Sequence, residues 1–311
     1  MSMSKAPRSV AHQSVPYSRS VRQIQSLDDL VVIMFQDPDK TPPKGWLNYI
    51  IHYAVLYAQP SPPFCHVELF HPSVLASIDG TRSPHFATYI GERAAWWMPD
   101  GFYKNHMGIF RAVPFVATGI GPASERVCQH CVGTPYSISR YLTRGPLRFL
   151  ARLLPEKLRS PAHCGILTSR IIKAAGGADG NAAFPDTPST YSPSRLYLDA
   201  TDFAQSRGIG SGGNFDQECA NHAITTLQSG TDIQVAELTP KESEMAIRGM
   251  AAAIYTAPPH AKRDAEVDLA SALIRLSYVR HSFGTYSPQE AASDVSSDEQ
   301  HLLRNVHTPH R

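Results

Sequence analysis

Short apolar runs separated by turn residues dominate the chain from residue 27 to residue 116, and apolar residues at helical spacing dominate after residue 160. Exposed strands alternate with a period of two, whereas fully buried strands are short continuous apolar runs. Runs of both kinds lie here between Pro, Gly and Asp residues, as "LDDLVVIMFQD" does before Pro38. We therefore predict β-strands within residues 27–37, 63–70, 85–92 and 107–116.

Helices are predicted where apolar residues recur every three or four positions or surround the helix completely. The stretch "WLNYIIHYAVLYA" is apolar all round, which is typical of a buried helix. "HCGILTSRIIKAAGG" carries one apolar stripe and ends in two glycines, a helix stop signal. The aromatic stretch 94–106 is predicted to be a loop. The predicted helices are residues 46–58, 121–133, 144–154, 164–177, 240–256 and 261–279.

Composition predicts a folded middle between loose ends. The first residues are polar, Ser-rich and basic without periodicity, and "SRGIGSGGNFD" is rich in glycine. The predicted segments are a disordered basic arm (1–26), one main domain (27–203), a linker (204–239), a helical extension (240–280) and a disordered tail (281–311).

The charge of the chain is small overall but unevenly distributed. The 311 residues carry a formal net charge of +2, and 42% of them are hydrophobic, enough for a buried core. Residues 126–173, however, contain the single acid Glu156 among many Arg and Lys residues. Such a basic segment is either a solvated face or a surface that meets polyanions. The arginines at four-residue spacing, which would form a phosphate-binding ladder on one helix, are Arg140, Arg144, Arg148 and Arg152.

Five cysteines, an odd number, and the lack of an apolar signal-like N-terminus indicate free thiols and a cytoplasmic protein. The apolar segment 46–58 is too short and too polar to span a bilayer, so we expect no transmembrane segment. "CQHC", residues 128–131, has the spacing of a zinc or redox pair, but a second pair is absent and two core thiols are the alternative. "GIGSGG", residues 208–213, lacks the strand that a nucleotide-binding glycine motif follows, so a flexible linker is the better interpretation.

One set of residues could carry thiol chemistry. Cys164 lies at the start of a predicted helix, where unpaired backbone N–H groups and the helix dipole favour a thiolate. In the predicted strand "PFCHVELF", His66 and Glu68 are two positions apart and therefore share one face. A histidine can take the thiol proton while a carboxylate orients its ring. The candidate catalytic residues are Cys164, His66 and Glu68.

The order and surroundings of these residues resemble the circularly permuted branch of the NlpC/P60 papain-like superfamily, which includes YiiX-type amidases and viral relatives. Four stretches over about residues 27–200 carry the resemblance: "DLVVIMF" followed by a buried helix, "FCHVELF", "VGTPYSISRYL", and "HCGILTSRIIKAAG" followed by "YSPSRLYLDA". The resemblance implies an α+β fold, in which a permuted papain-like core has an antiparallel sheet packed on helices.

The resemblance also implies roles for single residues. His66 matches the strand histidine, Cys164 the nucleophile and Glu68 the third polar position, while Tyr136 matches a recurrent aromatic. Relatives usually have Ser after the cysteine, where this chain has Gly165. In other members the third polar residue lies on the following strand, where Thr88 and Glu92 are the alternatives. The closing Ser-Pro-x-x-Leu segment is matched by Ser192, Pro193 and Leu196.

These features predict a cysteine hydrolase or acyltransferase that cleaves an amide or ester bond without a metal or a cofactor. The substrate classes that fit are a peptide, an isopeptide and a lipid ester. The predicted substrate-binding residues are Trp96, Trp97 and Tyr136.

The alternative hypothesis is a catalytically silent papain-like scaffold that associates with RNA. The Pro, Ala and Ser bias and the basic arm are similar to those of the proteins that coat genomic RNA in capsidless fungal viruses. The chain would then be virus-encoded, lie in the host cytoplasm and bind RNA through its N-terminal arm and the four arginines. The C-terminal helices either pack on the core or mediate formation of a homo-oligomer.

Overall fold

The computed structural model of the chain describes residues 21–40, 60–76, 83–89, 94–98, 102–135 and 164–284. Its centre is an antiparallel five-stranded sheet with the strand order β5-β4-β3-β2-β6. The fold is therefore α+β, as the sequence predicted. The strands are β2 (Leu30–Gln36), β3 (His66–Phe70), β4 (His85–Tyr89), β5 (Ala94–Trp97) and β6 (Phe110–Val116).

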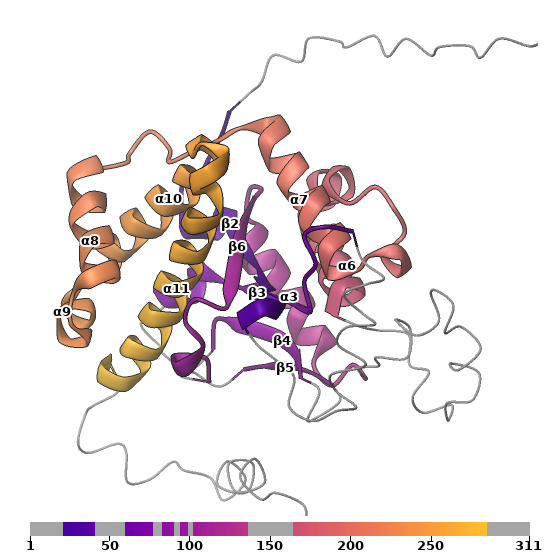
Figure 1. The fold of residues 1–311 in the computed structure, drawn as a ribbon, viewed down its shortest axis with the longest axis horizontal. Coiled ribbons are helices and arrows are strands. Elements are labelled where there is room, and N and C mark those ends of the chain that lie inside the picture. The colour runs from indigo at the N-terminus through magenta and orange to yellow at the C-terminus, as the bar shows by residue number, and fades with distance from the viewer. Residues whose placement is uncertain are drawn as a thin grey trace, which may run out of the picture.

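Helices cover both faces of this sheet (Figure 1). Strand β2 explains why, because its apolar side chains alternate between two separate cores: Ile33 belongs to one and Met34 to the other, and both are fully buried. The face of Ile33 packs against α3 (Ile120–Cys131), α6 (Cys164–Ala183) and α7 (Pro193–Arg207). The face of Met34 packs against α2 (Pro72–Ala76), α10 (Pro240–Thr256) and α11 (Pro259–Gly284).

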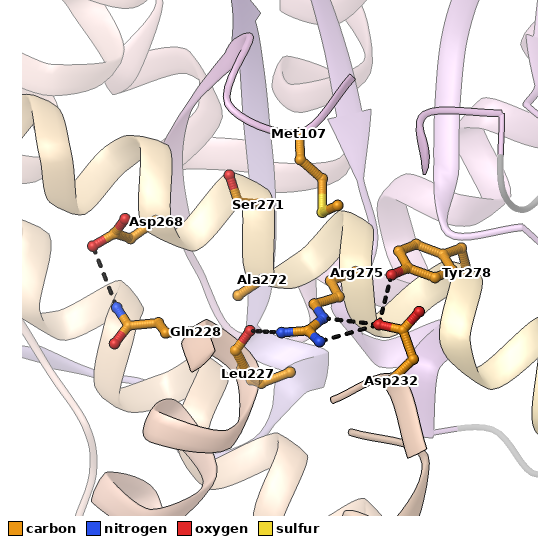
Figure 2. Close-up of a pocket in the computed structure, with 9 residues that line it drawn as sticks. All are labelled: Met107, Leu227, Gln228, Asp232, Asp268, Ser271, Ala272, Arg275 and Tyr278. Carbon is orange, nitrogen blue, oxygen red and sulfur yellow. Dashed lines mark hydrogen bonds and ion pairs between the residues drawn. The ribbon is translucent and has the colours of Figure 1, made fainter. Parts of the chain in front are cut away.

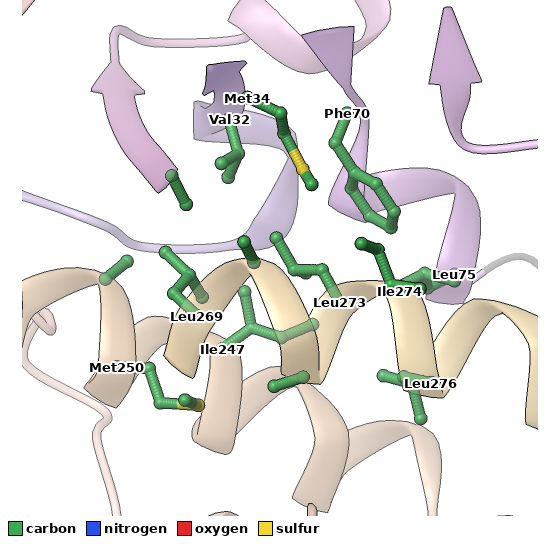
Figure 3. Packing of buried hydrophobic residues seen from close by; sticks show 14 of the residues in the cluster. Val32, Met34, Phe70, Leu75, Ile247, Met250, Leu269, Leu273, Ile274 and Leu276 are labelled. Carbon is green, nitrogen blue, oxygen red and sulfur yellow. The ribbon is translucent and has the colours of Figure 1, made fainter. Parts of the chain in front are cut away.

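The C-terminal helices are part of the folded core. Figure 3 shows Val32, Met34 and Phe70 of the sheet facing Leu269 and Leu273 of α11. The predicted helices at 240–256 and 261–279 are thus confirmed as α10 and α11. Because their apolar residues complete the second core, they do not form a separate extension.

The predicted linker 204–239 is wrong for most of its length. It contains α8 (Gln217–Ser229) and α9 (Asp232–Glu237), which pack on α10 and α11. Each helix begins at a side-chain cap, since Asp216 accepts a hydrogen bond from the backbone N–H of Cys219 and Thr231 forms a capping box with Gln234. The prediction gave weight to the preceding glycines and missed these caps.

The glycine-rich stretch 208–213 is structural. The short strand β7 (Ile209–Gly210) pairs in parallel with β1 (Arg22–Gln23). Gly212 has φ +83°, and a Cβ there would lie 2.6 Å from the Ile24 carbonyl oxygen and 2.7 Å from Nη2 of Arg248. The buried Arg248 side chain in turn donates to the Ser211 carbonyl and to Asn214. The glycines therefore permit close packing, and the predicted disordered arm is wrong for residues 22–24.

A buried ion pair joins α11 to the sheet. The Arg111 guanidinium on β6 lies 2.6 Å from a carboxylate oxygen of Glu266 on α11. The hydroxyl of Tyr197 on α7 donates to the same carboxylate over 3.0 Å and accepts from Arg111. Burial raises the pKa of Glu266, whereas the positive charge of Arg111 opposes that shift. One polar cluster thus links the sheet with helices from both of its faces.

The remaining predictions divide into three groups. The apolar runs at 27–37, 63–70, 85–92 and 107–116 contain strands β2, β3, β4 and β6, whereas the predicted aromatic loop 94–106 contains strand β5. Helix α3 is confirmed, and α6 is interrupted at Gly177 (φ 54°), where a stop was predicted. The segments 1–20, 46–58, 144–154 and 285–311 lie outside the described residues.

Two short 3₁₀ helices flank β2, one more lies between α6 and α7, and another precedes β6. They are η1 (Leu27–Asp29), η2 (Pro38–Lys40), η5 (Pro188–Thr190) and η3 (Lys104–His106). Within the described ranges, no helix is both long and apolar enough to cross a membrane.

Candidate active site

His66 and Glu68 lie side by side at the start of β3, the central strand of the sheet. The alternation of the strand places both side chains on one face, and the His66 Nε2 atom lies 3.3 Å from an oxygen of Glu68. The carboxylate is almost completely buried at 2% exposure, whereas the imidazole retains 15%. The predicted pairing of these two residues is therefore present.

Cys164 meets the same histidine from a distant part of the chain. It is the first residue of α6, and its side chain is hydrogen-bonded to that of His66. The other partner of the same imidazole is Glu68, whose carboxylate faces Nε2. The first turn of a helix offers backbone N–H groups that have no acceptor within the helix, which favours negative charge at this position. The three predicted catalytic residues are thus brought together.

The pKa values of His66 and Glu68 are both shifted towards the charged forms of these side chains. Burial opposes protonation of His66, but the negative charge of Cys164, its hydrogen bond and the Glu68 carboxylate outweigh it and raise the histidine pKa from 6.5 to about 10. For Glu68, burial opposes ionisation, yet the hydrogen bond to His66, the nearby His85 ring and the positive charge of His66 lower the carboxyl pKa to about 2. These two shifts favour an imidazolium on His66 beside an ionised Glu68 carboxylate, with the Cys164 sulfur as the other partner of the imidazolium.

Sequence reasoning missed two residues that contact Glu68. Tyr103 is the residue before η3. Its hydroxyl donates a hydrogen bond to the Glu68 oxygen that faces His66. His85, at the start of β4, has its Nδ1 atom 3.8 Å from the other carboxylate oxygen. That separation is longer than a hydrogen bond. Because Tyr103 lies in a stretch predicted as an aromatic loop, its sequence position carried no sign of this contact.

A second cysteine–histidine pair, Cys128 and His71, differs from Cys164 and His66 in the partner of the histidine. The Cys128 sulfur on α3 lies 3.8 Å from Nε2 of His71, and both side chains are fully buried. Burial lowers the His71 pKa to about 4 and raises the pKa of the Cys128 thiol. This pair is therefore neutral. The Nδ1 atom of His71 faces the Pro84 carbonyl oxygen, where His66 has the carboxylate of Glu68.

The segment 191–194 connects the two halves of the site. The Ser194 hydroxyl accepts a hydrogen bond of 2.9 Å from the backbone N–H of Phe64, two residues before His66. The backbone of Tyr191, Ser192 and Pro193 passes over Gly165, next to Cys164. Ser192 also caps α7 by accepting from the Arg195 N–H. This closing segment therefore contacts both strand β3 and the start of α6 and holds them next to each other.

The same contact explains why glycine follows the cysteine. A Cβ at Gly165 would lie 2.8 Å from the Tyr191 carbonyl oxygen and 3.1 Å from the Ser192 carbonyl carbon. These are backbone atoms, so no side-chain rotation relieves the clash. A side chain such as Ser, which the resemblance to the NlpC/P60 superfamily led us to expect after the cysteine, does not fit at this position, and Gly165 is the residue that does.

Replacing Gly165 with Ala is therefore expected to lower the free energy of unfolding by about 1–3 kcal/mol. Gly176→Ala, in the same helix, is the matched control, because a Cβ there meets only side-chain atoms at 3.4 Å or more. Alanine is the better helix former, so the control is expected to be neutral or stabilising. Urea unfolding of the two variants measures the difference, and equal stabilities would show that the close approach at Gly165 is unimportant.

The predicted substrate-binding tryptophans lie on the edge strand β5. The Trp97 indole N–H donates to Gln129 on α3 over 3.1 Å, and its ring packs near those of His71 and Phe86. Trp97 is thereby accounted for by packing, whereas Trp96 is 40% exposed. Tyr136 and the predicted RNA-binding residues Arg140, Arg144, Arg148 and Arg152 lie outside the described residues, as does Glu92. The other alternative, Thr88, is buried on β4, while Glu68 occupies the position beside His66.

Among the described residues, no group of three or more His, Cys, Asp and Glu side chains could hold a metal ion. Cys128 and Cys131 both lie on α3, and Cys128 is a core residue beside His71. The two thiols thus fit the structural interpretation of "CQHC".

A separate pocket of about 470 Å³ lies between α8, α9 and α11 (Figure 2). Arg275 crosses it and donates to the Leu227 carbonyl over 2.9 Å and to Asp232 over 3.0 Å. Tyr278 donates to the same Asp232 carboxylate over 2.9 Å. These contacts attach α8 and α9 to α11. None of the residues that line the pocket belongs to the Cys164 group.

No protein-family model matches this chain, and it has no match among curated proteins or solved structures.

Proposed function

We propose that this protein is a cysteine hydrolase or acyltransferase that acts on an amide or ester bond through Cys164, His66 and Glu68. The observation that carries the proposal is the contrast between the two cysteine–histidine pairs. His66 has a raised pKa and a buried carboxylate on its second nitrogen, whereas His71 has a lowered pKa and only a carbonyl oxygen there. A core thiol needs no such partner, whereas the base that activates a nucleophile is oriented by a third group, and Glu68 can be that group here.

The chemistry follows from the geometry in two steps. The Cys164 thiolate attacks the substrate carbonyl carbon, and N–H groups at the start of α6 face the negative charge that develops on its oxygen. His66 then gives its proton to the leaving amine or alcohol, so that a thioester to Cys164 forms. In the second step His66 takes a proton from water or from an acceptor, whose oxygen or nitrogen breaks the thioester and restores the thiolate. Glu68 keeps the ring oriented in both steps.

The imidazole of His66 is more exposed than the Cys164 sulfur beside it. Cys164 is 1% exposed, whereas His66 retains 15% of its side-chain exposure. We propose that a substrate carbonyl group approaches the sulfur from the side of the His66 ring, which is the more exposed of the two groups. This approach suits a narrow acyl or peptidyl group, and peptides, isopeptides and lipid esters all contain one.

The scaffold that we propose is the permuted papain-like core. It is supported by the chain order, in which the strand histidine precedes the helix cysteine, and by the antiparallel sheet that α6 covers. The closing segment at Ser192, Pro193 and Leu196 supports it as well, because Leu196 is fully buried and Ser194 anchors the strand of His66.

Trapping of an acyl-enzyme tests this function. Incubation with p-nitrophenyl acetate is expected to release p-nitrophenolate and to leave one acetyl group on Cys164, located by peptide mass spectrometry. The Cys164→Ser variant should lose the rapid release, whereas Cys219→Ser, at a half-buried helix thiol, should retain it. Acetylation spread equally over the five cysteines, or none at all, would contradict the proposal.

A further inference from the structure

We infer that Tyr103 is a positioning residue which, together with His85, holds the Glu68 carboxylate against His66. The inference rests on the proposed function and concerns how the carboxylate of the same site is held in place. Tyr103 and His85 come from two elements that the catalytic residues do not occupy, namely the loop before η3 and strand β4.

The contacts of Glu68 divide its two oxygens between these partners. One oxygen accepts the hydrogen bond from the Tyr103 hydroxyl and faces His66 Nε2 at 3.3 Å. The other oxygen lies 3.8 Å from His85 Nδ1, and within the described part of the chain neither of these two atoms has a hydrogen-bond partner. A small rotation of the carboxylate would close this gap to a hydrogen bond. Tyr103 opposes that rotation because it holds the first oxygen.

The ring of Tyr103 is itself fixed by packing. It lies 4.9 Å from the His85 ring and 5.2 Å, edge to face, from Phe110. The next residue, Lys104, places its ammonium group 5.0 Å from the centre of the Tyr278 ring on α11. The loop that carries Tyr103 is thus held between the sheet and the C-terminal helix. This contact gives α11 a connection to the catalytic residues.

The charge of Glu68 depends on this arrangement. The titratable groups that face it are His66 from its own strand, His85 from β4 and Tyr103 from the loop. A hydrogen bond to the ionised form stabilises a buried carboxylate, so loss of the Tyr103 hydroxyl favours protonation of Glu68. A protonated Glu68 no longer stabilises the imidazolium of His66. The His66 pKa then falls, so the thiolate of Cys164 loses its counter-ion at a lower pH than in the wild type.

The experiment measures the alkylation rate of Cys164 by iodoacetamide as a function of pH in the whole protein. Tyr103→Phe retains the ring but removes the hydroxyl, and it is expected to lower the rate roughly tenfold near neutral pH and to end the flat part of the profile at a lower pH than in the wild type. Phe102→Leu is the matched control, because its ring packs on Tyr103 at 4.9 Å but it leaves the hydroxyl in place. The control should leave the profile unchanged.

A double-variant cycle separates positioning from general loosening of the loop. In a Glu68→Gln background, Tyr103→Phe should cause no further tenfold loss, because the charge that the hydroxyl stabilises is gone. A profile of Tyr103→Phe identical to that of the wild type, with Cys164 still fast, would overturn this inference and leave the proposed function standing. A wild-type Cys164 that reacts no faster than Cys128 would overturn the proposed function and this inference with it.

Discussion

Replacing His66 with Ala is expected to slow alkylation of Cys164 by about 100-fold near pH 6. An ordinary cysteine, with a pKa near 8.5, is a thiolate in well under about one per cent of molecules at that pH. In the wild type the imidazolium beside the sulfur stabilises the thiolate, and the pKa of about 10 for His66 means that this positive charge is present near pH 6. Removal of the ring returns the sulfur to the behaviour of an ordinary thiol.

The alkylation rate of Cys164 should also depend on pH differently in the wild type and in His66→Ala. Because the folded pKa of His66 is raised above 6.5, the imidazolium and the stability that it contributes are fully present below that pH and are lost only as the pH rises towards 10. The wild-type rate should therefore stay nearly flat between about pH 6 and pH 9. In His66→Ala the rate should rise with each pH unit, as thiolate forms in solution.

Competitive labelling with isotopic iodoacetamide, followed by peptide mass spectrometry, measures both effects. Cys128 serves as an internal reference, because burial holds it as a thiol. His130→Ala, which removes an exposed histidine on α3, is the matched control and should change nothing at Cys164. A His66→Ala rate equal to that of the wild type would show that the imidazole does not activate this thiol.

Replacing Arg111 with Met is expected to produce the largest loss of stability, about 3–5 kcal/mol, because it leaves the carboxylate of Glu266 buried and unpaired. Glu266 is 0% exposed and Arg111 is 13% exposed, so water cannot replace the missing partner. The pair Arg263–Asp37, at 2.8 Å, is the comparison, because Arg263 is 56% exposed although the Asp37 side chain is 11% exposed. Arg263→Met should cost less than about 1 kcal/mol, since ion pairs made by an exposed arginine contribute little.

Urea unfolding of the two arginine variants gives the comparison directly. The double variant Arg111→Met with Glu266→Leu removes both charges and should recover most of the lost stability, because an apolar pair of similar volume carries no desolvation cost. Equal losses for Arg111→Met and Arg263→Met would show that the buried pair has no special role in joining α11 to the sheet.

Features that depend on neighbouring residues were predictable from the sequence. The continuous apolar run of β2 predicts a strand buried on both faces, and the two-residue spacing of His66 and Glu68 places them on one face. The position of Cys164 at a helix start follows from the apolar stripe behind it. The core helices α10 and α11 are likewise visible in their periodicity, although not their place against Met34 and Phe70.

Features that depend on contacts between distant segments were decided only by the tertiary structure. Two cysteine–histidine pairs look alike in the sequence, and only folding places a carboxylate on His66 and a carbonyl oxygen on His71. Tyr103 and His85 join the site in the same way, and Gly165 is required because the segment at Tyr191 passes over it. Periodicity is a property of adjacent residues, whereas the charge of a buried group is set by whatever the folded chain places beside it.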